Sequence, residues 1–310
     1  MKEMTGGSAS AGTGGSPVDP VAASPVDLAA ASSVRLAGIS EAVREAVPDA
    51  AVPIFEAATH LGDPALLTFA LALLYWAGRR HATATVIGYG FLGFAAVLAL
   101  KSLFALPRPP ESVWAISTYG YGFPSGHAVA GVIVYGGLAV EFDWLDDTRA
   151  VAGIGTLIAA IAFSRVVLGV HYLGDVLAGL VLGAVVVATA RYLTGGDPAR
   201  VFAVGAVAAL PTVWITGAGT DALGILGACI GGLVAATRLD DVPERGSRVG
   251  VAVLLLVGLP FVVVVQVLAV EDPLVLAPVD DLVLVAGVML LPAALKRVDA
   301  VDRLPVGAHG

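Results

Sequence analysis

The sequence predicts an all-helical protein that crosses the membrane several times, as a bundle of about nine spanning helices. Of its 310 residues, 57% are hydrophobic and only 14% are charged, whereas charged residues make up about a quarter of a typical soluble protein. The apolar residues form long runs separated by short polar turns, which is the pattern of membrane-spanning helices. The net charge of −8 and the scarcity of lysine argue against a nucleic-acid partner.

The N-terminal part precedes the apolar runs. Residues 1–32 are mainly Gly, Ser, Ala, Thr and Pro, which predicts a disordered tail without a signal peptide. Residues 33–50 are expected to form an amphipathic helix in the membrane interface, because Leu36, Ile39 and Val43 fall on one helical stripe. A soluble helix packed on a neighbour is the alternative. The charged side chains are expected to point away from that stripe: Arg35, Glu41, Arg44 and Glu45.

The first span is predicted at 54–78. Glu56, His60 and the turn at Gly62 interrupt this segment, so that only Ala65–Gly78 is continuously apolar. A span needs about 20 apolar residues, so this helix would have to start early. Clearer spans follow at 82–106, 126–142, 149–166, 172–192, 200–217, 221–237, 248–270 and 279–295.

These spans divide the chain into a core and an extension. The core covers residues 51–195, the extension of about four transmembrane helices covers residues 196–297, and a polar tail covers residues 298–310. Tryptophans near span ends are interpreted as interface anchors: Trp76, Trp114, Trp144 and Trp214. Asp280 and Asp281 are interpreted as solvated residues at the start of the last span.

The basic residues predict the orientation. If the turn at Arg79 is cytoplasmic, alternation of the spans places nearly all later basic residues on the cytoplasmic side, as the positive-inside rule requires. After residue 50, only Lys101, Arg108 and Arg165 remain on the outer side. The polar clusters that contain them should therefore meet at the extracytoplasmic face.

The first polar cluster holds Lys101 and Arg108, which are seven residues apart. They are expected to share one face at the outer end of a helix. Pro107 and Pro109 would terminate that helix. Two cations held together indicate an anion site, and the alternative is that both side chains only extend to the membrane interface.

The second cluster, Pro124-Ser125-Gly126-His127, stands just before an apolar run. Ser125 is expected to cap the following helix, and the backbone N–H groups of Gly126 and His127 at its N-terminus would form an anion site. Gly126 would also let a ligand approach the backbone closely. The alternative is an ordinary helix cap with an incidental histidine.

The third cluster contains His171 and Asp175, four residues apart, so that on a helix the carboxylate would hydrogen-bond one imidazole nitrogen and fix the tautomer. Such a pair is typical of a histidine that acts as a nucleophile or base. Arg165, near the preceding turn, offers a planar guanidinium to a phosphate. The alternatives are a satisfied buried pair, or a zinc site in which His127 takes part. The three cations would repel a divalent ion, so no metal is expected.

Together these clusters resemble the signature of the type 2 phosphatidic acid phosphatase family, whose site is similar to those of bacterial acid phosphatases and vanadium haloperoxidases. The resemblance covers about residues 60–192, and the C-terminal helices lie outside it. It rests on Lys101-x6-Arg108-Pro109, Pro124-Ser125-Gly126-His127 and Ser164-Arg165-x5-His171-x3-Asp175, in this order.

The resemblance implies that His171 forms a phosphohistidine intermediate, that Asp175 holds its ring and that His127 protonates the leaving oxygen. It implies no metal or other cofactor. The expected enzyme is a lipid phosphate or isoprenyl diphosphate phosphatase of the cell membrane, with its site on the extracytoplasmic side and with the bilayer and its lipid substrate as partners. The implied phosphate-binding residues are Lys101, Arg108, Ser125, Gly126 and Arg165.

Three other functions fit parts of the pattern. A phosphotransferase acting on lipid headgroups would use the same residues. A vanadate-dependent haloperoxidase is disfavoured because such proteins are typically soluble. A phospholipid-binding or transport protein without turnover would need only the cations to hold phosphate. It would not need an oriented nucleophile, so the presence of His127, His171 and Asp175 favours an enzyme.

Overall fold

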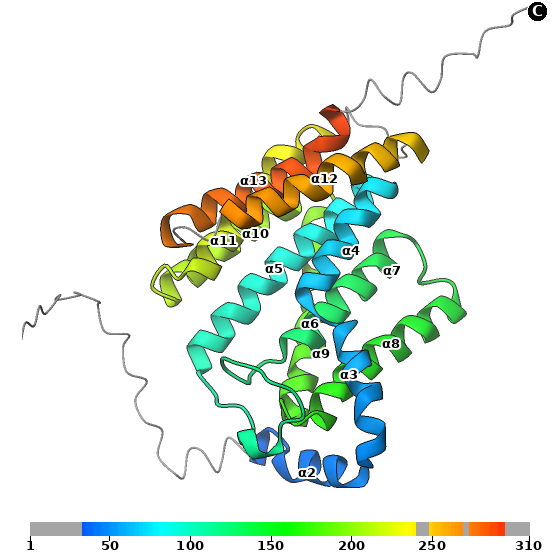
Figure 1. The fold of residues 1–310 in the computed structure, drawn as a ribbon, viewed down its shortest axis with the longest axis vertical. Helices are drawn as coiled ribbons and strands as arrows, with labels where there is room; N and C mark the ends of the chain where they lie inside the picture. Colours follow the sequence, from blue (N-terminus) through cyan, green and yellow to red (C-terminus); the bar gives the residue numbers. More distant parts are fainter. Residues whose placement is uncertain (1–32, 240–247, 269–272, 295–310) are drawn as a thin grey trace, which may run out of the picture.

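The computed structural model describes residues 33–239, 248–268 and 273–294, and every regular element in these ranges is a helix (Figure 1). The predicted all-helical class is confirmed. The tails expected at 1–32 and 298–310 fall outside the described residues. The helices of the first half are α2 (Ala37–Ala46), η1 (Asp49–Ala51), α3 (Val52–His60), α4 (Pro64–Ala77), α5 (Arg80–Phe104), η2 (Glu111–Val113), α6 (Gly126–Gly131), η3 (Val132–Gly136) and α7 (Gly137–Glu141). Those of the second half are α8 (Thr148–Val167), α9 (Leu173–Thr194), α10 (Pro198–Ile215), α11 (Thr220–Ala236), α12 (Arg248–Leu268) and α13 (Pro273–Ala294).

All nine predicted spans coincide with helices, but nine spanning helices are not confirmed. Within the described ranges, six helices are long and apolar enough to cross a membrane: α5, α8, α9, α10, α12 and α13. Helices α3 and α4 would form a seventh span only as one broken helix, since they meet at an angle of 47°. The helix from Gly126 to Glu141 and α11 are apolar but shorter. The number nine therefore stays a prediction, because these two helices fall just below the length of a span.

The break between α3 and α4 has a local cause in the sequence. The carboxylate of Asp63 accepts hydrogen bonds from the backbone N–H groups of Ala65 and Leu66, over 2.9 and 3.0 Å. Pro64 occupies the first position of α4, where its missing N–H costs nothing. A new helix therefore starts at this point and leaves the direction of α3.

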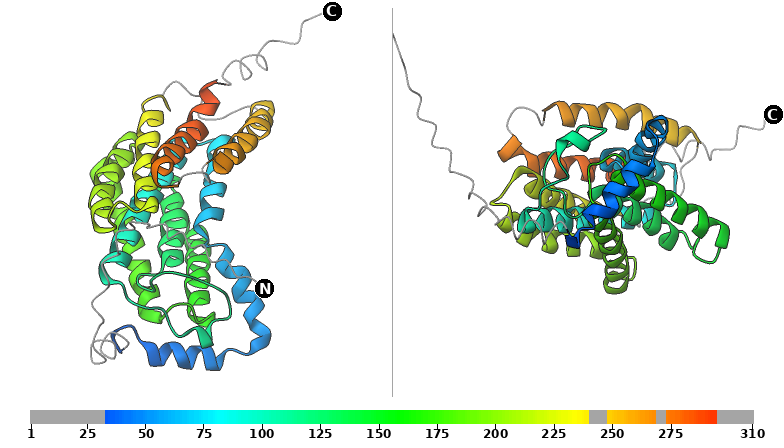
Figure 2. Two further views of the ribbon diagram at one scale, coloured as in Figure 1. Left: turned by 60° about the vertical axis from the view of Figure 1, so that its left-hand side comes forward. Right: turned by 90° about the horizontal axis from the view of Figure 1, so that it is seen from below.

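Helix α5 lies at the centre of the fold. It packs against α4, α6, η3, α7 and α9 on one side and against α10 and α11 of the C-terminal extension on the other. Helices α12 and α13 lie next to each other and also contact α4, as Figures 1 and 2 show. The end of α5 that carries Lys101 thus belongs to a helix that has neighbours on both sides.

Trp76 is not an interface anchor, contrary to the sequence interpretation. Its side chain is 1% exposed, and its indole N–H donates to the carbonyl of Val288 in α13 over 2.9 Å. The neighbouring Tyr75 donates from its hydroxyl to the carbonyl of Met289 over 2.8 Å. An apolar ring with one donor suits a helix–helix contact as well as a membrane interface, so these two residues attach α13 to α4.

The interpretation of Asp280 and Asp281 as solvated turn residues is also wrong, because α13 begins earlier than predicted and both aspartates lie inside it. Asp281 faces the glycine side of α11, where a Cβ at Gly224 would lie 2.2 Å from a carboxylate oxygen. The small residues of α11 let α13 approach closely, as is common in membrane bundles.

The N-terminal helix α2 packs against α8 and α9, so the alternative of a helix packed on a neighbour describes its contacts. In Figure 1 it lies across the end of the molecule near the start of α9. Ser40 reinforces this contact, because its buried hydroxyl accepts from the backbone N–H of Leu173 over 2.8 Å.

Candidate active site

The three polar clusters meet at one end of the bundle. His127 lies within electrostatic reach of Lys101, Arg108, Arg165 and His171. Each comes from a different place in the fold. Lys101 lies in the last turn of α5, Arg108 in the loop after it, Ser125, Gly126 and His127 at the start of α6, Arg165 in the last turn of α8, His171 just before α9, and Asp175 in the first turn of α9.

His171 is the centre of the site. It is 1% exposed, and its Nε2 lies 3.0 Å from Nη1 of Arg108. Its other nitrogen, Nδ1, lies 3.6 Å from Oδ2 of Asp175, just beyond hydrogen-bond length. The histidine is therefore held between a cation on one nitrogen and a carboxylate on the other.

Burial lowers the pKa of His171 to about 3, because the charged imidazolium is poorly solvated there. The contact with Asp175 acts in the opposite direction, and the positive charges of Arg108 and Arg165 lower this pKa further. At neutral pH the ring is thus uncharged and has a free electron pair.

Arg108 lies on a loop and not on the end of the helix, which corrects the expected arrangement. Helix α5 stops at Phe104, and Ala105 takes a left-handed conformation with φ of 46°. Pro107 disfavours a helical conformation at the preceding residue, so the chain turns before it reaches Arg108. Burial lowers the pKa of this guanidinium.

Backbone carbonyl groups hold Arg108 in place. Its guanidinium donates to the carbonyl of Val170 over 2.8 Å, to that of Gly120 over 3.0 Å, and to that of Tyr119 over 3.0 Å. Lys101 donates to the carbonyl of Tyr121 in the same loop. The loop between α5 and α6 therefore orients both cations of the first cluster.

Several polar atoms of the site are buried without a hydrogen-bond partner among the described residues, namely Oγ of Ser125, Nε of Arg165 and Nδ1 of His171. Ser125 does occupy the predicted N-cap position of α6, but its hydroxyl makes no capping bond. Nη1 of Arg165 donates to the hydroxyl of Thr59 over 2.5 Å. Buried polar groups normally have partners, so the hydroxyl of Ser125 and Nε of Arg165 are suited to a ligand that supplies acceptors, whereas Nδ1 of His171 faces Asp175.

Gly126 is the first residue of α6, and there is open space beside it. A Cβ at this position would meet only a methyl group of Val97, at 3.9 Å. The backbone at the start of α6 is therefore accessible to an oxyanion, as an anion site at a helix N-terminus requires.

The sequence analysis missed two residues at this site. Thr59 contacts Arg165, and Arg35 forms an ion pair with Asp175 in which Nε lies 2.6 Å from Oδ1. Arg35 was expected to point away from the apolar stripe of its helix, but it precedes α2 and is 4% exposed. No spacing rule links it to Asp175, which is 140 residues away.

The comparison with protein families agrees with the motifs. Residues 67–197 match the family model of the PAP2 superfamily. Among solved structures, the chain is similar to the first transmembrane PAP2-type phosphatidylglycerolphosphate phosphatase from Bacillus subtilis, with 21% sequence identity and a TM-score of 0.46 over 54% of this chain and 87% of that chain. No curated protein sequence matches the chain.

The matched residues include the three polar clusters and the apolar helices α5, α8 and α9. Over these residues, which make up less than half of the chain, the protein is similar to the PAP2 superfamily, and helices α5, α8 and α9 within them are long and apolar enough to cross a membrane.

Proposed function

We propose that the chain hydrolyses a lipid phosphate or an isoprenyl diphosphate without a metal, through a phosphohistidine on His171, at the extracytoplasmic face of the membrane. The observation that carries this proposal is the position of the His171 ring between Arg108 and Asp175, 3.0 Å from the first and 3.6 Å from the second. An uncharged, oriented imidazole next to fixed cations is the arrangement that nucleophilic attack on phosphorus requires.

In the first step, Nε2 of His171 forms a bond to phosphorus, and the bond from phosphorus to the leaving oxygen breaks. The bound anionic phosphate favours the protonated form of His127, which gives its proton to that oxygen, so the lipid leaves as an alcohol or, from a diphosphate, as a monophosphate. In the second step, His127 takes a proton from water, the resulting hydroxide attacks phosphorus, and the bond to Nε2 breaks. Inorganic phosphate is released and both histidines return to their first state.

The phosphoryl oxygens bind to the cations of the site. Arg165 has an unpartnered buried Nε, and the buried hydroxyl of Ser125 is also free to donate. Arg108 moves its Nη1 from Nε2 of His171 to a phosphoryl oxygen when substrate enters. These fixed donors, with Lys101 and the backbone of Gly126, stabilise the charge of the transition state in place of a metal ion.

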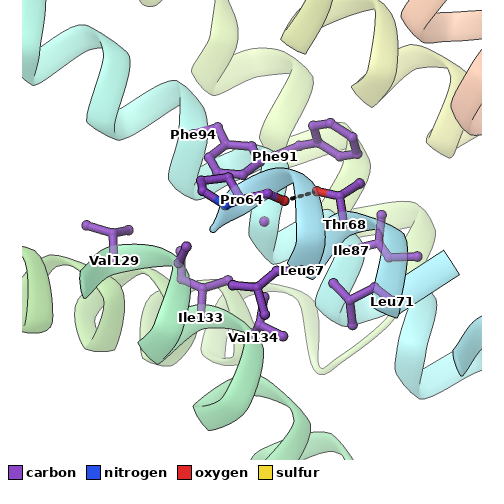
Figure 3. Close-up of a pocket in the computed structure, with 12 residues that line it drawn as sticks. Pro64, Leu67, Thr68, Leu71, Ile87, Phe91, Phe94, Val129, Ile133 and Val134 are labelled. Atoms are coloured by element: carbon purple, nitrogen blue, oxygen red, sulfur yellow. Dashed lines mark hydrogen bonds between the residues drawn. The ribbon is translucent and has the colours of Figure 1, made fainter. Parts of the chain in front are cut away.

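A lipid substrate is supported by an apolar pocket beside the site (Figure 3). Helices α4, α5 and the segment α6–η3 line the pocket, and the side chains of Leu67, Phe91, Phe94 and Ile133 face it. Val129, which also lines it, lies on the same helix as His127 and two residues further on. The pocket is small, about 20 Å³, and a methyl or methylene group of a hydrocarbon chain attached to the phosphate would gain free energy by entering it.

The extracytoplasmic location is supported by the distribution of basic residues over the two ends of the bundle. The turns that precede α5 and follow α7 and α9 gather at the other end, where Arg79 lines a polar hollow with Glu141, and Arg191 pairs with Glu141. Basic residues favour the cytoplasmic side. Arg35 and Arg44 lie at the site end, where Asp175 neutralises the charge of Arg35.

The test is release of phosphate from a panel of lipid mono- and diphosphates by the purified protein in detergent with EDTA. The wild type is compared with His171→Ala and with a matched control, His81→Ala, whose exposed side chain lies at the opposite end of α5. We expect the wild type and the control to release phosphate and the His171 variant to release none. Equal release by all three proteins would refute the nucleophile, and transfer of labelled phosphate to an added lipid alcohol would indicate a phosphotransferase.

A further inference from the structure

Arg35 forms a buried, bidentate ion pair with Asp175 of the site. It lies outside the residues that match the family model. Its Nε lies 2.6 Å from Oδ1 of Asp175 and its Nη2 lies 2.8 Å from Oδ2. Its Nη1 donates to the carbonyl of Pro107, the residue before Arg108, over 2.8 Å. One guanidinium thus connects the first and third polar clusters.

Arg35 is closely surrounded by neighbouring residues. The backbone N–H of Gly174 donates to the carbonyl of Arg35 over 3.0 Å, and a Cβ at Gly174 would lie 2.7 Å from its Cα. A Cβ at Gly122 would lie 2.7 Å from its Nη2. The guanidinium also lies over the ring of Tyr172, 4.6 Å from its centre. The start of α9 and the loop between α5 and α6 are therefore shaped to receive the N-terminal segment.

The ion pair determines where the carboxylate of Asp175 points. Oδ2 accepts from Nη2 of Arg35 at 2.8 Å and from the backbone N–H of Tyr172 at 3.0 Å. Nδ1 of His171 lies 3.6 Å from the same oxygen. Asp175 is thus oriented by Arg35 and by the backbone, and the histidine faces a carboxylate that is already fixed. A bidentate pair fixes both the position and the plane of a carboxylate.

We propose that Arg35 is a positioning residue for the reaction, which acts on His171 through Asp175. This inference rests on the proposed function, in which Asp175 orients the nucleophile. Removing Arg35 frees the carboxylate to rotate, so His171 loses its alignment with phosphorus. Arg108 loses the bond that Arg35 makes to its neighbour Pro107 but keeps its own bonds to three backbone carbonyls. Misplacement of a reacting group by about 1 Å is enough to reduce a rate by about 100-fold.

The experiment is a double-mutant cycle on the full-length protein, with kcat and KM measured on the best lipid phosphate of the panel. The variants are Arg35→Ala, Arg35→Lys, Asp175→Asn and the double variant Arg35→Ala/Asp175→Asn. The control is Arg44→Ala, a substitution of another arginine on the same N-terminal segment, which has no contact with Asp175. Thermal unfolding of each protein in detergent is recorded beside the kinetics.

We expect Arg35→Ala to lower kcat by roughly 10- to 100-fold with KM changed by less than about 3-fold, and Arg35→Lys to recover part of the loss. In the Asp175→Asn background, the loss of Arg35 should lower kcat by no more than about 3-fold. Arg44→Ala should behave as the wild type. A purely structural ion pair would lower the unfolding temperature without this selective effect on kcat.

Two outcomes would overturn the inference. One is a folded Arg35→Ala protein with the kcat of the wild type, and the other is a loss in the double variant equal to the product of the two single losses. Arg35→Ala could fail to fold because it leaves the charge of Asp175 unpaired. The double variant has no such unpaired charge, so in that case the ratio of its kcat to that of Asp175→Asn tests the inference. Activity that survives His171→Ala would instead refute the proposed function, and the role of Arg35 with it.

Discussion

Nη1 of Arg108 donates to Nε2 of His171 over 3.0 Å, and this contact determines the tautomer of the histidine. A guanidinium has donors and no acceptor, so Nε2 must carry the free electron pair. In the uncharged ring the proton is therefore on Nδ1, which faces Asp175. The nitrogen proposed to attack phosphorus is thus the one that already points at Arg108, a proposed phosphate-binding cation.

Arg108→Lys should lower kcat/KM by about 100- to 1,000-fold, although the charge is kept. Lysine cannot reproduce the planar set of donors that holds three backbone carbonyls and Nε2 of His171 at the same time. Losing one preorganised donor of this kind usually costs that much. Steady-state kinetics on the best lipid phosphate measure the effect. A variant within about 3-fold of the wild type would show that Arg108 supplies only charge.

Ser125→Ala should impair activity without reducing stability. The hydroxyl is fully buried and has no hydrogen-bond partner among the described residues, so its removal breaks no bond within the protein. A hydrogen bond to a charged phosphoryl oxygen is worth about 1.5–3 kcal/mol, which predicts a loss in kcat/KM of roughly 10- to 100-fold.

Ser164→Ala is the matched comparison for Ser125→Ala. It is equally buried, but its hydroxyl donates to the carbonyl of Ile161 over 2.7 Å. This variant should lose about 0.5–1.5 kcal/mol of stability. Thermal unfolding and kinetics of the two variants should therefore separate a ligand-binding hydroxyl from a structural one, and an equal loss of stability in both would contradict the assignment of Ser125.

His171 should make the folded protein less stable in acid. Burial lowers its pKa from 6.5 to about 3, so between these two values the unfolded chain binds a proton that the folded chain does not. The free energy of unfolding must then fall as the pH falls from about 6.5, by about 2 kcal/mol at pH 5. Unfolding of the wild type and of His171→Gln at pH 7.5 and pH 5 measures this contribution. The variant should lose about 2 kcal/mol less than the wild type, and an identical loss in both proteins would contradict the assignment.

The sequence predicted the helical class and the meeting of the three clusters, because hydropathy and motif spacing are local properties. It did not predict what depends on contacts between distant segments. Trp76 looked like an interface anchor because its partner, the carbonyl of Val288, is 212 residues away. Arg35 looked like a solvated residue for the same reason. The position of Arg108 off the helix follows from Pro107, but its contact with His171 depends on the path of the whole loop.

The last prediction concerns the contact between α11 and α13 in the C-terminal extension. At Gly227 a Cβ would lie 1.9 Å from the carbonyl oxygen of Pro278. This clash is with backbone, so side-chain rotation cannot relieve it, and Gly227→Ala must move one helix away from the other. We expect a loss of about 1–3 kcal/mol in the free energy of unfolding.

Gly153→Ala on α8 is the control for this substitution, because a Cβ there meets nothing within 4 Å, and it should be neutral or slightly stabilising. Because α13 also packs on α4 through Trp76 and Tyr75, the loss at Gly227 should be accompanied by loosening of α4. Faster hydrogen exchange in α4 of Gly227→Ala, with α8 unchanged, would support this connection. A change confined to α11 and α13 would show instead that the extension does not support the helices next to the site.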